Sequence, residues 1–100
     1  MPPNEIRLLH EPISRSELAA IAAAGFGDMV KAVVDIHRGI MAIGGDLHSD
    51  EEAAMLDDGS SQGDLWGINL YPAQGNRSRS VEDAALRTEI VRIARSLVTD

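Results

Sequence analysis

Hydrophobic residues along this chain follow two spacings, and each spacing predicts one kind of secondary structure. Over residues 29–37 they alternate with polar residues, which is typical of a strand with one buried face. The residues expected on that face are Val30, Ala32, Val34 and Ile36. A two-residue turn at Arg38 and Gly39 follows, so residues 29–47 are predicted to form a hairpin. Two further strands are expected, at residues 5–10 and 65–71.

Helical spacing occurs three times, each time after a residue that can cap a helix. The first predicted helix begins with a capping box of Ser14 and Glu17 and ends near Gly25, which is expected in the left-handed conformation. The other two predicted helices cover residues 49–59, with a second capping box of Ser49 and Glu52, and residues 80–98. The last helix carries an apolar stripe of Leu86, Ile90, Ile93 and Leu97.

The predicted element order is therefore βαββαβα. Its first six elements match the split βαβ pattern of a ferredoxin-like sandwich, and a C-terminal helix is added. This order predicts an α/β protein of the two-layer α+β kind. With 100 residues, we expect one domain over residues 1–100.

Composition narrows the classes of function. Apolar residues make up 44% and charged residues 25% of the chain, which is typical of a globular domain. The chain has no cysteine, so disulfides, thiolate metal sites and cysteine nucleophiles are excluded. The longest apolar run covers residues 18–24, too short to span a membrane, and we expect a cytoplasmic protein with no membrane partner. No cofactor is expected.

The net charge of −7 argues against non-specific binding of nucleic acid, which requires an excess of Lys and Arg. This charge is concentrated in residues 46–64, which hold seven acidic and no basic residues. Residues 65–100 hold five arginines against four acids. The rest of the surface is therefore free to bind a partner of another charge.

The strongest candidate for chemistry is the segment of residues 74–80, just before the last predicted helix. Its two arginines, its glycine, its hydroxyls and the free N–H groups of a helix start predict an anion site. The alternative is a polar loop whose arginines pair with the acidic segment. Together with Trp66 as a neighbouring contact, the expected ligand-binding residues are Asn69, Tyr71, Gly75, Asn76, Arg77, Arg79 and Ser80.

Residues 44–45 are two glycines, which predict a bulge or a close approach of the backbone. Asp46 and His48 follow, and a carboxylate from Glu51 or Glu52 would complete a weak candidate metal site. No recognised ligand spacing is present, and acidic residues in a first helical turn are favoured by the helix dipole, so no metal is expected.

A second weak candidate lies at the end of the hairpin. Asp35 and His37 share a strand face, and such a pair can orient an imidazole for acid–base catalysis. A surface cross-strand pair is the alternative.

Several blocks of the sequence resemble a prokaryotic family known as a domain of unknown function. The blocks are Gly27-Asp28-Met29-Val30-Lys31-Ala32-Val33-Val34-Asp35-Ile36, Gly39-Ile40-Met41-Ala42-Ile43-Gly44-Gly45, Asp64-Leu65-Trp66-Gly67-Ile68-Asn69-Leu70-Tyr71-Pro72, Gln74-Gly75-Asn76-Arg77-Ser78-Arg79 and Val81-Glu82-Asp83. The resemblance implies no established activity. It implies a longer segment, with another strand, between the last two large blocks, where this chain has only residues 70–73. Either this chain has lost that segment, or the chain is interrupted between Tyr71 and Gln74.

Three classes of function follow from these observations. The first is a small binding or interaction module that takes an anionic ligand or a partner protein, or that forms a homo-oligomer. The second is an enzyme acting on a phosphate-containing or nucleotide substrate, with Asp46, His48 or His37 as acid–base groups. The third is an acidic partner that neutralises a basic protein. Its contact residues would be Asp50, Glu51, Asp57 and Asp58.

Overall fold

The computed structural model describes residues 6–72 and 84–99, and its elements form a mixed α and β fold. In chain order the elements are β1 (Arg7–Leu9), β2 (Ile13–Ser14), α1 (Arg15–Ala24), β3 (Val30–Asp35), β4 (Ile40–Ile43), α2 (His48–Asp57), the 3-10 turn η1 (Gln62–Asp64), β5 (Leu65–Leu70), α3 (Ala84–Ser96) and β6 (Val98–Thr99). No helix within these ranges has the length and apolar character that a membrane crossing requires.

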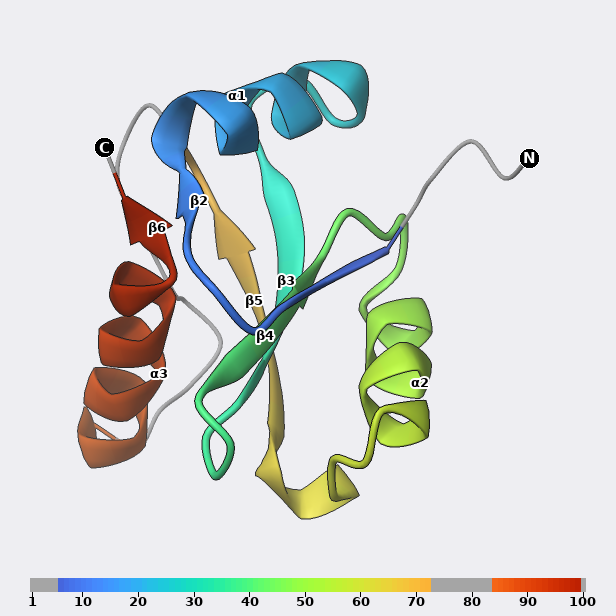
Figure 1. Cartoon of the computed structure of the whole chain (residues 1–100), viewed down its shortest axis with the longest axis vertical. Coiled ribbons are helices and arrows are strands. Elements are labelled where there is room, and N and C mark those ends of the chain that lie inside the picture. The colour runs from blue at the N-terminus through green and yellow to red at the C-terminus, as the bar shows by residue number, and fades with distance from the viewer. Residues whose placement is uncertain (1–5, 73–83, 100) are drawn as a thin grey trace.

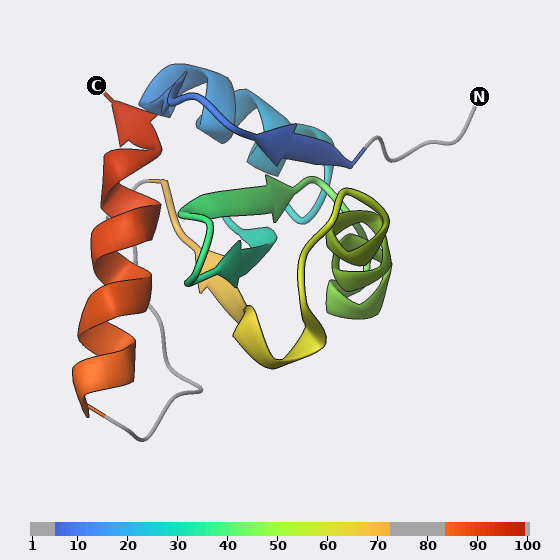
Figure 2. The same ribbon diagram turned by 60° about the horizontal axis from the view of Figure 1, so that its bottom comes forward.

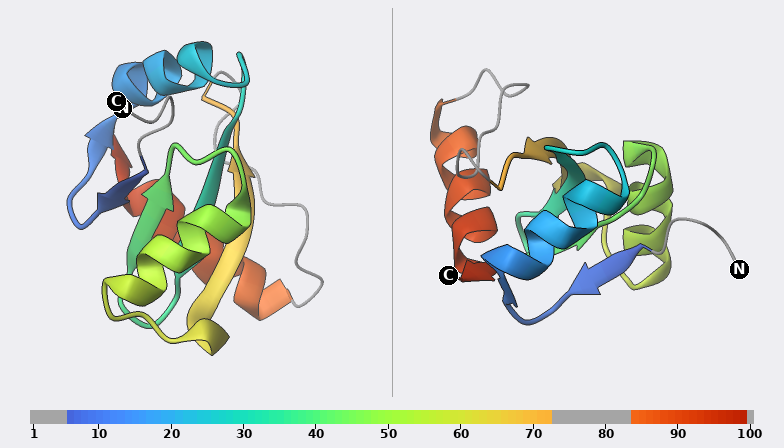
Figure 3. Two further views of the ribbon diagram at one scale, coloured as in Figure 1. Left: turned by 90° about the vertical axis from the view of Figure 1, so that its right-hand side faces the viewer. Right: turned by 90° about the horizontal axis from the view of Figure 1, so that it is seen from above.

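A four-stranded antiparallel sheet in the order β1-β4-β3-β5 forms the centre of the molecule (Figure 1). β2 and β6 form a separate parallel pair, which joins the start of α1 to the end of α3. Helices cover both faces of the large sheet: α2 lies on one side, and α1 and α3 lie on the other (Figure 2). Figure 3 shows α1 crossing over one end of the strands.

The core has two parts because β3 and β4 are buried on both faces. Alternate residues of β3, at positions 30, 32 and 34, join the larger cluster with α1 and α3. Between them, Val33 faces the smaller cluster, which contains Ala42 of β4 and Met55 of α2. Strands buried on both faces lose almost all contact with water, so this hairpin anchors all three helices.

The predicted α+β class is confirmed, and so are the hairpin and the apolar stripe of the last helix. The predicted two-layer arrangement is wrong, because helices pack on both faces of the sheet. The split βαβ unit is present, since β4 lies between β1 and β3. The full ferredoxin-like arrangement is not: that fold pairs its last strand with its first, whereas β5 pairs with β3 at the opposite edge. The element order also gains β2 and β6, which are two residues long and too short to leave a periodic signal.

The observed helix ends agree in part with those predicted from the sequence. Ser14 caps α1 as predicted, because its hydroxyl accepts the Glu17 N–H at 3.1 Å. At the other end, Gly25 has a φ of −113°, and the positive φ of +100° falls on Gly27 instead. The predicted capping box of Ser49 and Glu52 is wrong, because α2 begins at His48 without a side-chain cap.

Asp35 closes the turn between β3 and β4, which spans four residues rather than the predicted two. Its buried carboxylate accepts the backbone N–H groups of His37 and Arg38 at 2.8 and 2.9 Å. The Ser60 hydroxyl donates to its other oxygen at 2.6 Å. Asp35 therefore holds the backbone of the turn and does not orient the His37 imidazole, so the acid–base hypothesis for this pair is wrong.

The same contacts explain the pKa of Asp35. Burial opposes ionisation, but the hydrogen bonds from Ser60 and from the backbone of Arg38 and His37 outweigh it and lower the pKa. Arg38 continues the network by donating to Ser60 and to Asp58 at 3.0 Å each. The network connects the hairpin to the segment that follows α2.

Replacing Asp35 should destabilise the fold strongly. In D35A, two backbone N–H groups and one hydroxyl lose their buried acceptor, which we expect to cost about 2–3 kcal/mol in the free energy of unfolding. Urea denaturation measures this cost. The matched control is D57A at an exposed aspartate, which should change stability by less than about 0.5 kcal/mol. Equal stability of both variants would contradict the assigned role.

Candidate functional site

Four elements meet at the end of the sheet opposite the hairpin turn. β4 ends at Ile43, and residues 44–47 lead from it into α2. β3 begins here and β5 ends here, since Val30 pairs with Leu70 in the antiparallel register. Side chains from β3, β5, α2 and the β4–α2 junction therefore converge, although they are far apart in the sequence.

Glu51 lies at the centre of this region and is fully buried. The Gly45 N–H donates to its Oε2 at 2.9 Å, while its Oε1 has no partner in the described part of the chain. Burial raises the pKa of Glu51 to about 8, even though the Gly45 hydrogen bond and the charge of Lys31 act in the opposite direction. Glu51 is therefore mainly protonated at neutral pH.

The expectation of a close backbone approach at the two glycines is met at Gly45. A Cβ atom placed on Gly45 would lie 2.8 Å from Cγ of Glu51. The buried position of Glu51 corrects the sequence interpretation, which placed it among the acids that would contact a basic partner. The signal that was available is the pair of glycines at positions 44 and 45, which leaves room for a side chain.

His48 connects α2 to β5. Its Nε2 lies 2.8 Å from the carbonyl oxygen of Ile68, and its ring covers Gly67, where a Cβ would be 3.2 Å away. Across residues 6–72 and 84–99, no three His, Asp or Glu side chains are grouped to hold a metal ion. Asp46 and His48 thus gain no third ligand from the residues described.

The candidate residues of β5 divide between its two faces. Asn69 stands opposite Lys31 in the register, and its buried Oδ1 has no hydrogen-bond partner among the described residues. Trp66 faces the other way and packs against the cluster formed with α1 and α3. The expected contact surface that combined Trp66 with Asn69 is therefore split. Tyr71 is half-buried, and the other predicted ligand residues, at 75–80, lie outside the described residues.

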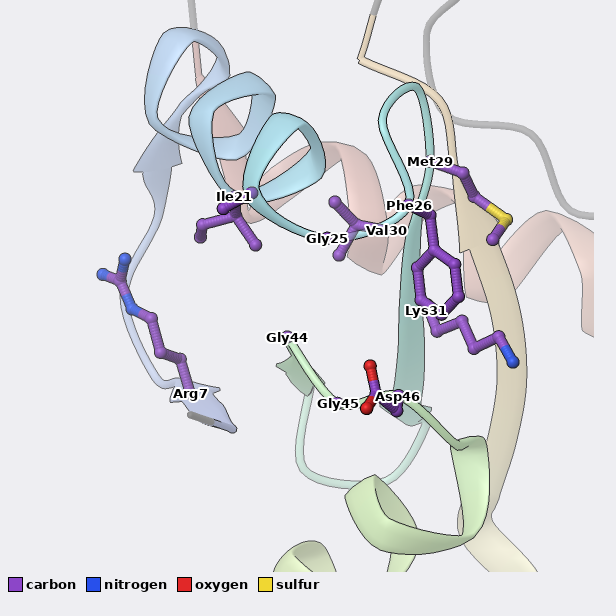
Figure 4. A pocket seen from close by; sticks show the side chains of 11 residues that line it. Arg7, Ile21, Gly25, Phe26, Met29, Val30, Lys31, Gly44, Gly45 and Asp46 are labelled. Atoms are coloured by element: carbon purple, nitrogen blue, oxygen red, sulfur yellow. The ribbon is translucent and has the colours of Figure 1, made fainter. Parts of the chain in front are cut away.

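A pocket of about 300 Å³ opens between the end of α1 and the β4–α2 junction (Figure 4). Its apolar wall comes from the end of α1, the loop that follows it and the start of β3. The apolar residues with side chains larger than alanine are Ile21, Phe26, Met29 and Val30. Residues 44–46 form the opposite side, from which the Asp46 carboxylate points into the cavity (Figure 4).

Two cationic side chains complete the lining of this pocket, Arg7 of β1 and Lys31 of β3. They lie on opposite sides of it in Figure 4. Arg7 pairs with Glu17 of α1, and the Lys31 ammonium lies 5.1 Å from the centre of the Phe26 ring. Phe26 remains 46% exposed at this rim. The pocket thus combines an apolar wall with charges of both signs.

The catalytic groups considered from the sequence do not meet in this pocket. His37 lies beyond Asp35, at the other end of β3 from Lys31. His48 is directed to the Ile68 carbonyl, so Asp46 alone of the three lines the cavity.

The acidic segment is less exposed than its composition implies. Glu51 is buried, and Asp58 pairs with Arg38 at 3.0 Å and with His10 at 3.3 Å. Two of the four acids expected to bind a basic partner are therefore engaged within the fold.

Glu51 should make stability depend on pH. Between its ordinary pKa of 4.5 and about 8, the unfolded chain ionises Glu51 while the folded chain keeps it protonated. The free energy of unfolding then falls as pH rises, by up to about 1.4 kcal/mol per pH unit from this group. Urea denaturation across this range should show a smaller slope for E51Q. The control D57N, at an exposed aspartate at the other end of α2, should keep the slope. An unchanged slope in E51Q would refute the assignment.

Gly45 should tolerate no side chain while Glu51 is present. In G45A the new methyl group meets Cγ of Glu51 at 2.8 Å, and the overpacking should cost about 1–3 kcal/mol. The control G63A places a methyl group where nothing lies within 4 Å. Combining G45A with E51A should remove most of the cost of G45A, and additive effects of the two substitutions would argue against this contact.

Comparisons with known proteins identify a family for this chain. Residues 7–75 match the family described as "Protein of unknown function (DUF5674)". Curated proteins and solved structures gave no match. The matched range covers more than half of the chain and contains every residue that lines the pocket. The chain belongs to the DUF5674 family.

Proposed function

We propose that this protein is a small binding module that holds a metabolite-sized ligand with an anionic group in the pocket between α1 and the β4–α2 junction. The observation that carries the proposal is the pair of cations, Arg7 and Lys31, on opposite sides of a cavity with an apolar wall. Such pockets bind through apolar contact and gain specificity from a few polar groups.

The size of the cavity supports a small ligand. About 300 Å³ lies at the lower end of the range for ligand pockets. A molecule with one carboxylate or one phosphate and a short apolar part fits this range. A whole nucleotide, the substrate class of the enzyme hypothesis, is larger and fits the cavity less well.

The separation of the acid–base groups supports binding over catalysis. Proton transfer requires a base within hydrogen-bond reach of its substrate. Among the described residues, Asp46 is the one carboxylate that lines the cavity, and neither histidine that we considered as its partner does so.

Arg77 and Arg79 belong to a second proposal, an anion site in the loop of residues 75–80, and this proposal still rests on the sequence alone. Self-association and binding of a basic protein also remain proposals. Neither gains support from a contact in the described residues.

Titration of the whole chain with 4-methylpentanoate and with inorganic phosphate, followed by NMR, tests the proposal. K31Q and R7Q should each weaken binding about tenfold, the equivalent of about 1.4 kcal/mol. The control R95Q removes an exposed charge on α3 and should leave binding unchanged.

The same titration distinguishes the two proposed anion sites. If R77A/R79A abolishes binding while K31Q does not, the ligand lies at the arginine loop. If neither anion binds the wild-type protein at millimolar concentration, the proposed function is wrong. Thermal melting of each variant shows whether a loss of binding is a loss of folding.

A further inference from the structure

We propose that the pocket takes up its anionic ligand together with a proton, and that Glu51 is the group that holds this proton. The inference rests on the proposed function and adds regulation of the same pocket by pH. The carboxyl group of Glu51 lies directly behind Gly45, which lines the cavity. A ligand on the other side of this wall is therefore close enough to respond to the charge of Glu51.

The contact between Glu51 and the pocket wall is direct. The Gly45 N–H donates to Oε2 of Glu51 at 2.9 Å. A Cβ on Gly45 would lie 2.8 Å from Cγ and 3.3 Å from Oε2 of Glu51, so no side chain separates the carboxyl group from the backbone of the wall. Figure 4 shows this wall, with Gly45 between Gly44 and Asp46.

Lys31 is the cation that Glu51 shares with the pocket. Its side chain lines the cavity, and its charge also favours the ionised form of Glu51. None of the ion pairs formed within residues 6–72 and 84–99 involves Lys31. A bound anion and an ionised Glu51 would therefore compete for the same positive charge.

This competition couples the ligand to the proton. An ionised Glu51 has few other sources of stabilisation, because its Oε1 has no donor among the described residues and Asp50 repels it. An anion bound beside Lys31 adds a further negative charge, which makes ionisation of Glu51 still less favourable. By linkage, protonation of Glu51 must strengthen binding of the anion by the same factor.

The other charged or titratable groups near Glu51 belong to α2, to the junction before it and to the pocket. They are Lys31, Asp46, His48 and Asp50. The neighbouring strands β4 and β5 contain no charged residue, and Arg7 of β1 is paired with Glu17. The variant E51Q keeps all of these groups, so its difference from the wild type reports the titration of Glu51 alone.

Calorimetric titration of the intact protein with 4-methylpentanoate at pH 7, 8 and 9 tests the inference. These values bracket the Glu51 pKa of about 8, while the carboxylate of the probe stays ionised throughout. Binding to the wild type should weaken about fivefold from pH 7 to pH 9. At pH 8.5, two buffers with different ionisation enthalpies should reveal the uptake of about half a proton per ligand.

The variant E51Q has a neutral side chain at every pH. It should bind the probe at pH 9 about fivefold more tightly than the wild type does and should take up no proton. Loss of folding cannot produce tighter binding, so this result is specific to the charge of Glu51. The matched control D57N, at the other end of α2, should retain the pH dependence of the wild type.

The outcomes separate the two proposals. If the wild type binds the probe equally well at pH 7 and pH 9, or if E51Q weakens with pH as the wild type does, the proton-coupled inference is overturned and an anion pocket stands. If the probe does not bind at pH 7, or if K31Q binds it as tightly as the wild type does, both proposals are overturned.

Discussion

Burial of the β3–β4 hairpin on both faces is the constraint on which the rest of this fold depends. Val33 and Ala42 face α2, while their neighbours along the two strands face α1 and α3. A hairpin in this position must satisfy most of its polar groups internally, because little water reaches either face. The turn at one end and the junction with α2 at the other are therefore the two places where polar chemistry must be arranged.

Each of these places holds a buried carboxyl group, and the two groups are in opposite states. Asp35 accepts three hydrogen bonds at the turn, which compensate its burial and keep it ionised. Glu51 accepts one, from Gly45, and its other oxygen has no donor among the described residues, so burial raises its pKa. The number of donors that reach a buried carboxyl group decides its charge. The turn is thus stabilised by the ionised carboxylate of Asp35. The junction beside the pocket instead holds the carboxyl group of Glu51, whose pKa is about 8.

The sequence predicts those parts of the fold in which one face is apolar and the other is polar. The stripe of α3 is of this kind and is confirmed; in β3 the predicted apolar face is confirmed, but the other face, expected to be polar, is also buried, at Val33 and Asp35. The α2 helix is different, because its buried side chains are Glu51 and Met55, whereas its other large apolar side chain, Leu56, is exposed. Nothing in its pattern distinguishes Glu51 from Asp50 or Glu52, since the difference arises from the approach of Gly45. The strand order likewise depends on which edge of the hairpin receives β5, and periodicity within a strand carries no information about its neighbours.

The pocket could not be predicted from the sequence either, because its charged residues are far apart along the chain. Runs of charge and compact motifs are visible in a sequence, and they direct attention to the acidic segment and to the arginine loop. Arg7 and Lys31 belong to no such motif and lie on different strands, and Asp46, the first residue of the acidic segment, lies between β4 and α2. The antiparallel pairing of β1 with β4 and of β4 with β3 brings them to one end of the sheet. A site built this way is visible only once the fold has brought these single charges together beside one apolar wall.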